Sequence, residues 1–411
     1  MRVVLVNHCH PETPHVCATR MREYSKVLSK LGHEVILLTE TLAGQPTDIT
    51  PDQAARAIQD HDFSTPLNLA SEPKGHPLIK SLRARTLPWG LRQLVVVWYY
   101  LRHQGVFTDW RAGSQPYIQS IVDHFKPDIV WATFGNTDCW NIARDLAQAA
   151  ICPWIADAKD PWQNFIPTIF RNYLAKYYGD SAAMTAFSKF HVADIQKYFG
   201  REASVVYSGF STDQAAPSTP LNPDEMTISL TGAIYDQQAL TQLIQGVKSW
   251  LIGLPEKKRA NACFIYAGQD SDAVAAATMD LSTICRIDIK GFIPLEELRH
   301  IHRRAIANLY IKSNLTFHHK TIEMLSAGRP LICYPEETEE AVEISQSTSV
   351  PLFSCDSPEQ VSEALDQSLN IGLINIQEDG GLKALTWESQ AKKLEEIFLN
   401  VANKQNDSAN A

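Results

Sequence analysis

Residues His318 to Pro335 read HHKTIEMLSAGRPLICYP, and this stretch predicts a short helix that leads into a buried strand. Gly328 is expected to stop the helix, and Pro330 introduces the apolar run LICY. Lys320 and Glu323 are both expected in the first helical turn, on nearly the same face. The stretch therefore predicts one α/β unit that carries two opposite charges at the start of its helix.

Short apolar runs bounded by Gly, Pro, Asn or Asp recur along the whole chain. In the first half they read VVLVN, VILLT, IVWAT, WIAD, MTAFS and SVVYSG, and in the second half TISLTG, CFIYAG, IDIKGF, ANLYIK, LICY and PLFSC. Near-continuous apolar character is typical of strands buried on both faces of a parallel sheet. Helical patterns lie between the runs, and this alternation predicts doubly wound sheets.

The series of strands and helices occurs twice, and a length of 411 residues suits two domains of about 200 residues each. The change-over falls at residues 208–225, which are rich in Ser, Pro and Asp and are interpreted as a linker. We therefore predict an α/β protein with two Rossmann-like, doubly wound domains that face a cleft. Ligands bind such sheets just beyond the carboxyl ends of the strands, so the functional site is expected there.

The composition narrows the class of protein. Hydrophobic residues make up 45% of the chain and charged residues 20%, as in soluble globular proteins. The formal net charge of -9 argues against a nucleic-acid partner, because a chain that binds nucleic acid along its length is usually basic.

Cysteine usage and the apolar runs suggest a compartment. The eight cysteines are scattered without a C-x-x-C pair, which indicates a reducing environment with no disulfide framework and no zinc knuckle. The opening MRVVLVNHCHPE is interpreted as a first strand rather than a signal peptide. The longest apolar run, Leu94 to Leu101, is far shorter than a membrane span. We therefore expect a cytoplasmic protein, with peripheral attachment to the inner face of the plasma membrane as an open alternative.

One segment interrupts the alternation, and it has two interpretations. Residues 75–113 are basic and aromatic, with Lys80, Arg83, Arg85, Arg92, Arg102 and Arg111 among Trp89, Trp98, Tyr99, Tyr100 and Trp110. The segment could be a long insertion packed on the first domain. It could also be a docking face for an anionic membrane surface or a lipid-linked substrate.

The charges in the opening stretch suit a nucleoside diphosphate. Helix N-termini at the carboxyl edge of such a sheet attract phosphates, and Lys320 adds a full positive charge there. Glu323 cannot help to hold phosphate, but its carboxylate can accept both hydroxyls of a ribose. The alternative is an exposed ion pair between the two residues, worth a few tenths of a kcal/mol.

Several stretches, in the correct order, resemble the group-1 (family four) glycosyltransferases of the GT-B fold over nearly the whole chain. KTIEMLSAGRPLICY is similar to the donor-site element K-x-x-E-x-x-x-x-G-x-P of that family. Further stretches resemble strands, turns and helices of the same family. They are MRVVLVN with the GHEV turn, KPDIVWAT, PWIADAKDPW, VVYSGF, LTGAIYDQQ, YAGQD, DIKGFIPLEEL and TWESQAKKLEEIF. The last of these resembles the closing helix that crosses back to the first domain.

The resemblance implies domain roles, substrates and site residues. Residues 1–208 would bind the acceptor, residues 209–385 the nucleotide sugar, and residues 386–411 would form the closing helix and a polar tail. The substrates would be a UDP- or GDP-linked sugar and a hydroxyl acceptor that is a glycan or lipid-linked, with retention at the anomeric carbon and no cofactor or metal. The expected donor-binding residues are Thr231, Gly232, Gly268, Gly291, Phe292, Lys320, Thr321 and Glu323.

The chain departs from the family pattern in three places. Leu315 stands where the family usually has another glutamate, eight positions before Glu323, that holds the hydroxyls of the donor sugar. HCHPETPHVCATR replaces the glycine-rich loop after the first strand. Asp236 and two glutamines follow the TG of the second domain in place of a basic residue. A rearranged donor loop is the interpretation that keeps Lys320 and Glu323 in their roles.

Three residues of the first domain are candidate catalytic groups. Asp157 and Asp160 follow a buried strand and could orient or deprotonate an acceptor hydroxyl. They could equally be cap or turn residues before Pro161. His10 follows the first strand at the same edge and could contact the acceptor or a phosphate, or be a polar loop residue. No H-E-x-x-H or carboxylate–histidine motif predicts a metal site.

The leading hypothesis is a glycosyltransferase that moves a sugar from a nucleoside-diphosphate sugar to a hydroxyl acceptor. The alternatives are a GT-B sugar-nucleotide epimerase or hydrolase, and a catalytically silent GT-B protein that binds a glycan or another partner.

Overall fold

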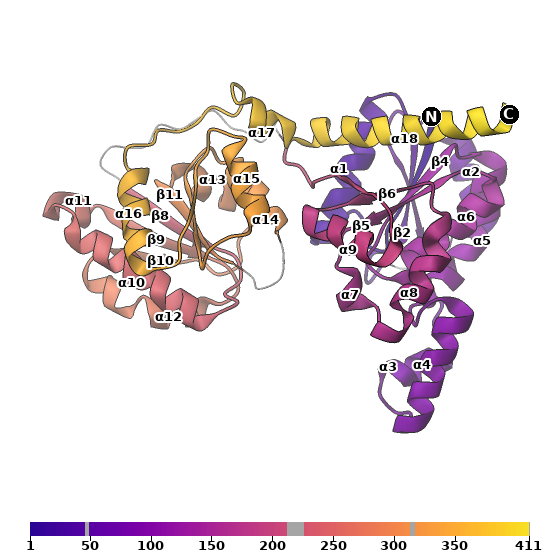
Figure 1. Ribbon diagram of the computed structural model, residues 1–411, viewed down its shortest axis with the longest axis horizontal. Coiled ribbons are helices and arrows are strands. Elements are labelled where there is room, and N and C mark those ends of the chain that lie inside the picture. The colour runs from indigo at the N-terminus through magenta and orange to yellow at the C-terminus, as the bar shows by residue number, and fades with distance from the viewer. Residues whose placement is uncertain (46–48, 212–225, 313–316, 411) are drawn as a thin grey trace. The chain divides into compact units, whose positions relative to one another are not determined.

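The computed structural model describes residues 1–45, 49–211, 226–312 and 317–410, the last five of these by their backbone alone. The chain divides into two compact units (Figure 1). Unit 1 comprises residues 1–208 and 387–411, and unit 2 comprises residues 209–386. The predicted linker lies mostly outside the described residues, because these omit 212–225, and Leu315 also lies outside them.

A parallel sheet of seven strands forms the centre of unit 1, in the order β3-β2-β1-β4-β5-β6-β7. The strands are β1 (Arg2–Val6), β2 (Glu34–Glu40), β3 (Leu67–Ser71), β4 (Ile129–Thr133), β5 (Trp154–Ala158), β6 (Ala183–Ala186) and β7 (Ser204–Val205). The helices are α1 (Val16–Lys30), α2 (Pro51–Asp60), α3 (Pro77–Arg83), α4 (Trp89–His103), α5 (Asp109–His124), α6 (Thr137–Ala150), α7 (Trp162–Phe165), α8 (Thr168–Tyr177), the 3-10 turn η1 (Tyr178–Asp180), α9 (Lys189–Phe199) and α18 (Trp387–Asn410).

Both faces of this sheet are covered, which explains its apolar strands. Val4 and Val6 of β1 pack into one core with α2, α5 and α6. Val3 and Leu5, which point the other way because side chains alternate along a strand, pack with α1 and α18. Figure 1 shows α18 lying along unit 1, beside strands that precede it by hundreds of residues.

Unit 2 is built around a parallel sheet of six strands, in the order β10-β9-β8-β11-β12-β13. The strands are β8 (Met226–Thr231), β9 (Ala262–Ala267), β10 (Arg286–Ile289), β11 (Ala307–Ile311), β12 (Leu331–Tyr334) and β13 (Leu352–Ser354). The helices are α10 (Gln237–Gly253), α11 (Glu256–Ala260), α12 (Ser271–Ala277), the 3-10 turn η3 (Met279–Thr283), α13 (Leu295–Arg304), α14 (His319–Leu325), α15 (Glu339–Gln346), α16 (Pro358–Ser368) and α17 (Gly380–Ala384).

The prediction of an α/β chain with two doubly wound parallel sheets is confirmed. Each of the twelve apolar runs contains a strand. The pattern missed β3, whose sequence LNLAS is only partly apolar because an edge strand is less completely buried.

The basic, aromatic segment is partly an insertion and partly a surface. Helices α3 and α4 project from the body of unit 1 (Figure 1) and share a small core formed by Ile79, Leu82, Val95 and Tyr99. Trp110 is fully buried in the main core of the unit. In contrast, Trp89 is 79% exposed and Trp98 is 50% exposed.

Candidate functional site

Lys320 lies at the carboxyl edge of the unit 2 sheet, where ligands of doubly wound sheets bind. Its Nζ donates a hydrogen bond of 3.1 Å to the carbonyl of Ile311, the last residue of β11. The ammonium also lies 4.9 Å from the centre of the Tyr310 ring and 5.4 Å from that of Tyr235. A Cβ added to Gly232, directly after β8, would lie 3.7 Å from Nζ. The fold therefore brings Lys320 next to an open stretch of backbone.

Three glycines lie at this edge of the sheet, one after each of three neighbouring strands. Gly232 has a φ of +93°, and Tyr266 donates a hydrogen bond of 2.9 Å to its carbonyl. The N–H of Gly268 donates to the carbonyl of Gly291 over 2.9 Å. A Cβ on Gly268 would lie 2.5 Å from the carbonyl oxygen of Gly232, so no larger residue fits there. Gly268 is thus packed against Gly232 and Tyr266, whereas Gly232 and Gly291 leave backbone that a ligand can approach closely.

Burial and two neighbouring groups shift the pKa of the Lys320 ammonium. Burial lowers the pKa of Lys320, while Cys333 and Glu337 partly oppose this shift. A partly desolvated ammonium interacts more strongly with an anion than one in bulk water. Lys320 is therefore suited to an anionic group bound at this edge.

Glu323 lies one turn further along α14 than predicted. The helix begins at His319 and has no acidic residue in its first turn, so the prediction for Glu323 is wrong, because His318 before it is extended. Glu323 Oε1 lies 3.3 Å from His319 Nε2. The side chain of Glu323 remains 30% exposed, so its carboxylate is accessible to a ligand.

The charge state of Glu323 follows from its surroundings. Burial raises the pKa of Glu323, and the attraction and hydrogen bond of His319 lower it. Arg299 and His302 act in the same direction as His319. The net shift lowers the pKa of Glu323, so the group is a carboxylate near neutral pH and can accept hydrogen bonds.

The start of α10 is closed to an anion. The carboxylate of Asp236 caps this helix and accepts hydrogen bonds from the N–H groups of Gln238 and Ala239, at 2.7 and 3.1 Å. A phosphate cannot use N–H groups that a carboxylate already holds. The start of α10 therefore does not offer N–H groups to a phosphate, and the expectation of phosphate beside Lys320 at the start of α14 stays a prediction.

The other predicted donor-binding residues differ in how far their side chains are exposed to solvent. Thr231 is buried, and its Oγ1 lies 3.1 Å from Nε2 of the buried His302. Thr321 is fully buried, and its hydroxyl makes no hydrogen bond within the described part of the chain. Phe292 is 87% exposed directly after Gly291. Phe292 can therefore touch a ligand, whereas Thr231 and Thr321 lie beneath the surface.

Asp157 is part of a buried ion pair rather than an open catalytic group. The side chains of Asp157 and Arg20 are both 0% exposed and approach to 3.2 Å. Thr133 and Thr185 donate to the same carboxylate, at 2.9 and 2.7 Å. Because these donors occupy it within the core, Asp157 has no access to an acceptor, and we interpret its role as structural.

Asp160 and His10 remain accessible at the carboxyl edge of unit 1. The side chain of Asp160 is 25% exposed and lies 3.8 Å from Lys159. Burial raises the pKa of Asp160 to about 6, and Lys159 limits the rise. His10 is half-buried, and its Nε2 lies 2.9 Å from the side-chain nitrogen of Asn68. Asp160 is thus the better placed of the two aspartates for proton transfer.

The sequence did not predict a group of two thiols and one imidazole that lies in the loop between β1 and α1. Ligand atoms of Cys9, His15 and Cys17 all lie within 4.8 Å of one another. The spacing C-x₅-H-x-C was the available signal, but it matches none of the common metal motifs. Only the path of the loop brings the three side chains together.

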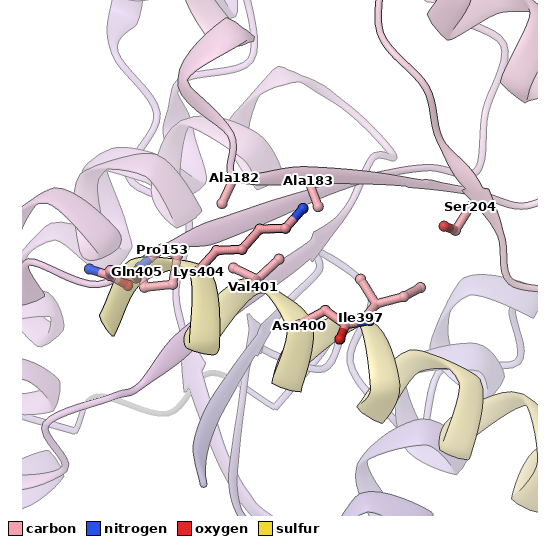
Figure 2. Close-up of a pocket in the computed structure, with 9 residues that line it drawn as sticks. All are labelled: Pro153, Ala182, Ala183, Ser204, Ile397, Asn400, Val401, Lys404 and Gln405. Atoms are coloured by element: carbon pink, nitrogen blue, oxygen red, sulfur yellow. The ribbon is translucent and has the colours of Figure 1, made fainter. Parts of the chain in front are cut away.

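A separate cavity of about 470 Å³ lies at the opposite edge of the unit 1 sheet, between α18 and the amino ends of β5, β6 and β7 (Figure 2). It is lined by Pro153, Ala182, Ala183, Ser204, Ile397, Asn400, Val401, Lys404 and Gln405. Because ligands of doubly wound sheets bind at the carboxyl edge, we assign this cavity no part in the candidate site.

Comparison with protein-family models and with curated protein sequences finds no match. Solved structures do match. HepE from Anabaena, in complex with UDP and glucose, has a TM-score of 0.55 at 11% identity, over 100% of this chain and 99% of that chain. A glycosyltransferase from Rickettsia africae has a TM-score of 0.59 at 13% identity, over 97% and 98% of the two chains. A candidate UDP-N-acetylglucosamine 2-epimerase from Listeria monocytogenes has a TM-score of 0.55 at 13% identity, over 96% and 94%.

These likenesses establish the class of fold. The chain has the two parallel-sheet domains of the GT-B fold, as predicted. At 11–13% identity the likeness carries the fold alone, and the narrower resemblance to family four stays a prediction.

Proposed function

We propose that this protein transfers a sugar from a nucleoside-diphosphate sugar to a hydroxyl acceptor. The observation that carries the proposal is the ammonium of Lys320 beside the open backbone of Gly232, at the sheet edge that also carries Gly291. A diphosphate needs both a close approach to backbone and a positive charge, and this edge offers both. The solved structures of HepE with UDP and glucose, and with UDP-glucose, support the choice of ligand.

Each donor-site residue then has a chemical task. Lys320 would stabilise the negative charge that builds on the leaving diphosphate. Glu323, a carboxylate with 30% of its side chain exposed, would accept the ribose hydroxyls. Phe292, exposed next to Gly291, would cover the base. We propose retention at the anomeric carbon, and a UDP- or GDP-linked donor.

On the acceptor side we propose Asp160 as the group that orients or deprotonates the hydroxyl. Its carboxyl is accessible, and its pKa of about 6 leaves it mostly ionised at neutral pH and still a useful base. His10 would act as a second polar contact at the same edge. Asp157 is left out of this role because it lies in a buried ion pair.

We further propose that the acceptor is held at an anionic membrane surface, as a lipid-linked molecule. Helix α4 exposes an apolar stripe formed by Leu91, Leu94, Trp98 and Leu101, and it exposes Trp89 at its first residue. A cavity of about 800 Å³ next to it is lined by basic and aromatic side chains that include Arg102, His103 and Trp98. Among the described residues no helix is both long and apolar enough to cross a bilayer.

A second candidate function is sugar-nucleotide epimerisation or hydrolysis. It is favoured by the likeness to the Listeria candidate epimerase and by Leu315, which replaces the glutamate expected to hold the donor sugar. The same donor site would serve either reaction. The products separate them, because transfer requires an acceptor and the alternatives do not.

The experiment is a donor screen with UDP- and GDP-sugars, read by mass spectrometry in the presence and absence of acceptors. Lys320→Ala should lower turnover and remove the thermal stabilisation by UDP or GDP, since a bound ligand raises stability through linkage. Lys258→Ala, at an exposed lysine of α11, is the matched control and should behave as wild type. Full stabilisation of the Lys320 variant by both nucleotides would refute the site. Binding without any turnover would favour a silent binding protein.

We also propose that transfer needs no magnesium or manganese at the diphosphate, because Lys320 supplies the charge. Turnover with the preferred donor should therefore persist in EDTA. A loss of turnover that magnesium or manganese restores, and zinc does not, would contradict this.

A further inference from the structure

The loop between β1 and α1 places two thiols and one imidazole around a common point. Ligand atoms of Cys9, His15 and Cys17 all lie within 4.8 Å of one another. The Cys9 Sγ to His15 Nδ1 distance is 3.5 Å. Two ligands at zinc bonds of about 2.3 Å to sulfur and about 2.0 Å to nitrogen are about 3.5 Å apart when the geometry is tetrahedral. The spacing thus matches one edge of a zinc tetrahedron.

We infer that Cys9, His15 and Cys17 form a zinc-binding site. Two sulfurs and one imidazole suit a borderline-soft cation such as Zn²⁺ and exclude magnesium and calcium, which bind oxygen. The fourth position goes to solvent. Zinc sites with three protein ligands commonly keep such an open position.

The surroundings give the site an entrance and a balanced charge. Cys9 and Cys17 are buried, whereas His15 is exposed, so the site opens to solvent on the imidazole side. Lys159 and Asp160, which lie 3.8 Å apart beside the loop, carry opposite charges. A dication with two thiolates therefore leaves the local net charge close to zero.

Helix α1 orients the site. His15 is the N-cap of α1, and its Nδ1 accepts a hydrogen bond of 3.2 Å from the N–H of Cys17. Because the distance that fits a zinc tetrahedron is measured to Nδ1, metal binding at this nitrogen would replace the cap. His8 also lies near, with Nε2 at 3.3 Å from Cys9 Sγ, but it is not part of the group whose ligand atoms all lie within 4.8 Å of one another. We therefore assign His8 to the surroundings of the site rather than to its ligands.

The test uses the full chain, reduced and stripped with a chelator, and titrated first with Co²⁺ and then with Zn²⁺. We expect one Co²⁺ per chain, with a thiolate-to-cobalt charge-transfer band and the visible bands of a tetrahedral site. Zinc should then abolish these bands by displacement. Cobalt binding without a thiolate band, or no binding by the reduced chain, would overturn the inference.

Variants assign the ligands. Cys9→Ser and Cys17→Ser should each lower zinc affinity at least about a hundredfold, and Cys152→Ser, at a cysteine outside the group, should not change it. His15→Asn keeps a capping side chain but removes the imidazole, and should also lose affinity at least about tenfold. If a buried cysteine variant fails to fold, the zinc affinity of His15→Asn provides the test of the site. Unchanged affinity in His15→Asn and in either cysteine variant would refute the site, as would a Cys9–Cys17 disulfide whose reduced form binds no cobalt.

Discussion

Lys320 and Glu323 are close in the chain, yet their contacts separate their roles. Lys320 points to the ends of β8 and β11, whereas Glu323 pairs with His319 and keeps part of its carboxylate exposed. The two side chains therefore do not form the simple ion pair with each other that was the alternative interpretation. Each has a partner that leaves room for a ligand.

We expect Glu323→Gln to weaken nucleotide binding without unfolding the chain. The amide keeps the shape of the side chain but loses the charge, and a charge-assisted hydrogen bond is worth about 1.5–3 kcal/mol. Isothermal titration with UDP and GDP should show a loss of about tenfold to a hundredfold for whichever nucleotide binds. Glu256→Gln, on the exposed start of α11, is the control. Equal affinities for all three proteins would mean that Glu323 does not contact the ribose.

His302 makes unit 2 sensitive to acid. Burial lowers the pKa of His302 to about 4 from its ordinary value of 6.5. Below about pH 6.5 the unfolded chain takes up a proton that the folded chain refuses, so stability falls as the pH falls towards 4. The full difference between the two pKa values corresponds to about 3 kcal/mol.

We therefore expect His302→Gln, which can keep the contact with Thr231, to flatten this pH dependence. Urea unfolding between about pH 7 and about pH 4 should show wild type losing about 3 kcal/mol more than the variant. Parallel curves for the two proteins would show that His302 is protonated in the folded state as well.

At the scale of single elements, α4 presents an exposed apolar face that the core of unit 1 does not cover. Val95 and Tyr99 pack with α3, and the neighbouring face presents the apolar stripe formed by Leu91, Leu94, Trp98 and Leu101. Arg85 and Arg102 are exposed beside it. Arginines next to tryptophans are typical of helices that lie in a membrane interface.

We expect the protein to float with anionic vesicles at low salt and to remain behind with neutral ones. Leu94→Ser combined with Trp98→Ser should reduce this association, whereas Leu399→Ser, at an exposed leucine of α18, should not. Replacing Arg85, Arg92 and Arg102 by Ala should weaken it about a hundredfold, at about 1 kcal/mol for each charge. Arg83 is left in place because it donates a hydrogen bond of 2.7 Å to Asp109. Vesicle binding that is the same for all variants, or absent in wild type, would refute the docking face.

At the scale of the whole molecule, the end of the chain completes the unit in which the chain begins. Trp387, Leu394, Phe398 and Val401 of α18 are buried against unit 1, and Trp387 meets Tyr24 edge to face at 5.4 Å. His33 also contacts Glu395 at 2.7 Å. Four large apolar side chains contribute roughly 6–12 kcal/mol by burial, which is comparable to the stability of a domain.

We therefore expect a chain that ends at Thr386 to lose the fold of unit 1 while unit 2 keeps its own. Limited proteolysis followed by mass spectrometry should recover a protected fragment close to residues 226–386 and none from residues 1–208. A chain that ends at Gln405 retains all the buried residues of α18 named above and is the control. Survival of unit 1 in the shorter chain would show that its core does not depend on α18.

The sequence alone determined the layered α/β fold, because strands buried on both faces appear as apolar runs that alternate with helices. It missed β3, since an edge strand is less apolar. It also placed Lys320 correctly in the first turn of α14, because local propensity decides where a helix starts.

Only the tertiary structure decided which side chains meet. Parallel strands bring their carboxyl ends together from distant parts of the chain, so Gly232 and Lys320 become neighbours. The same packing hides Asp157 against Arg20, a partner that no local pattern reveals. Cys9 and Cys17 are near in sequence, but the path of a loop decides whether their sulfurs converge. Local patterning acts over a few residues, whereas a binding site is a convergence of side chains in space, and packing of the whole unit determines it.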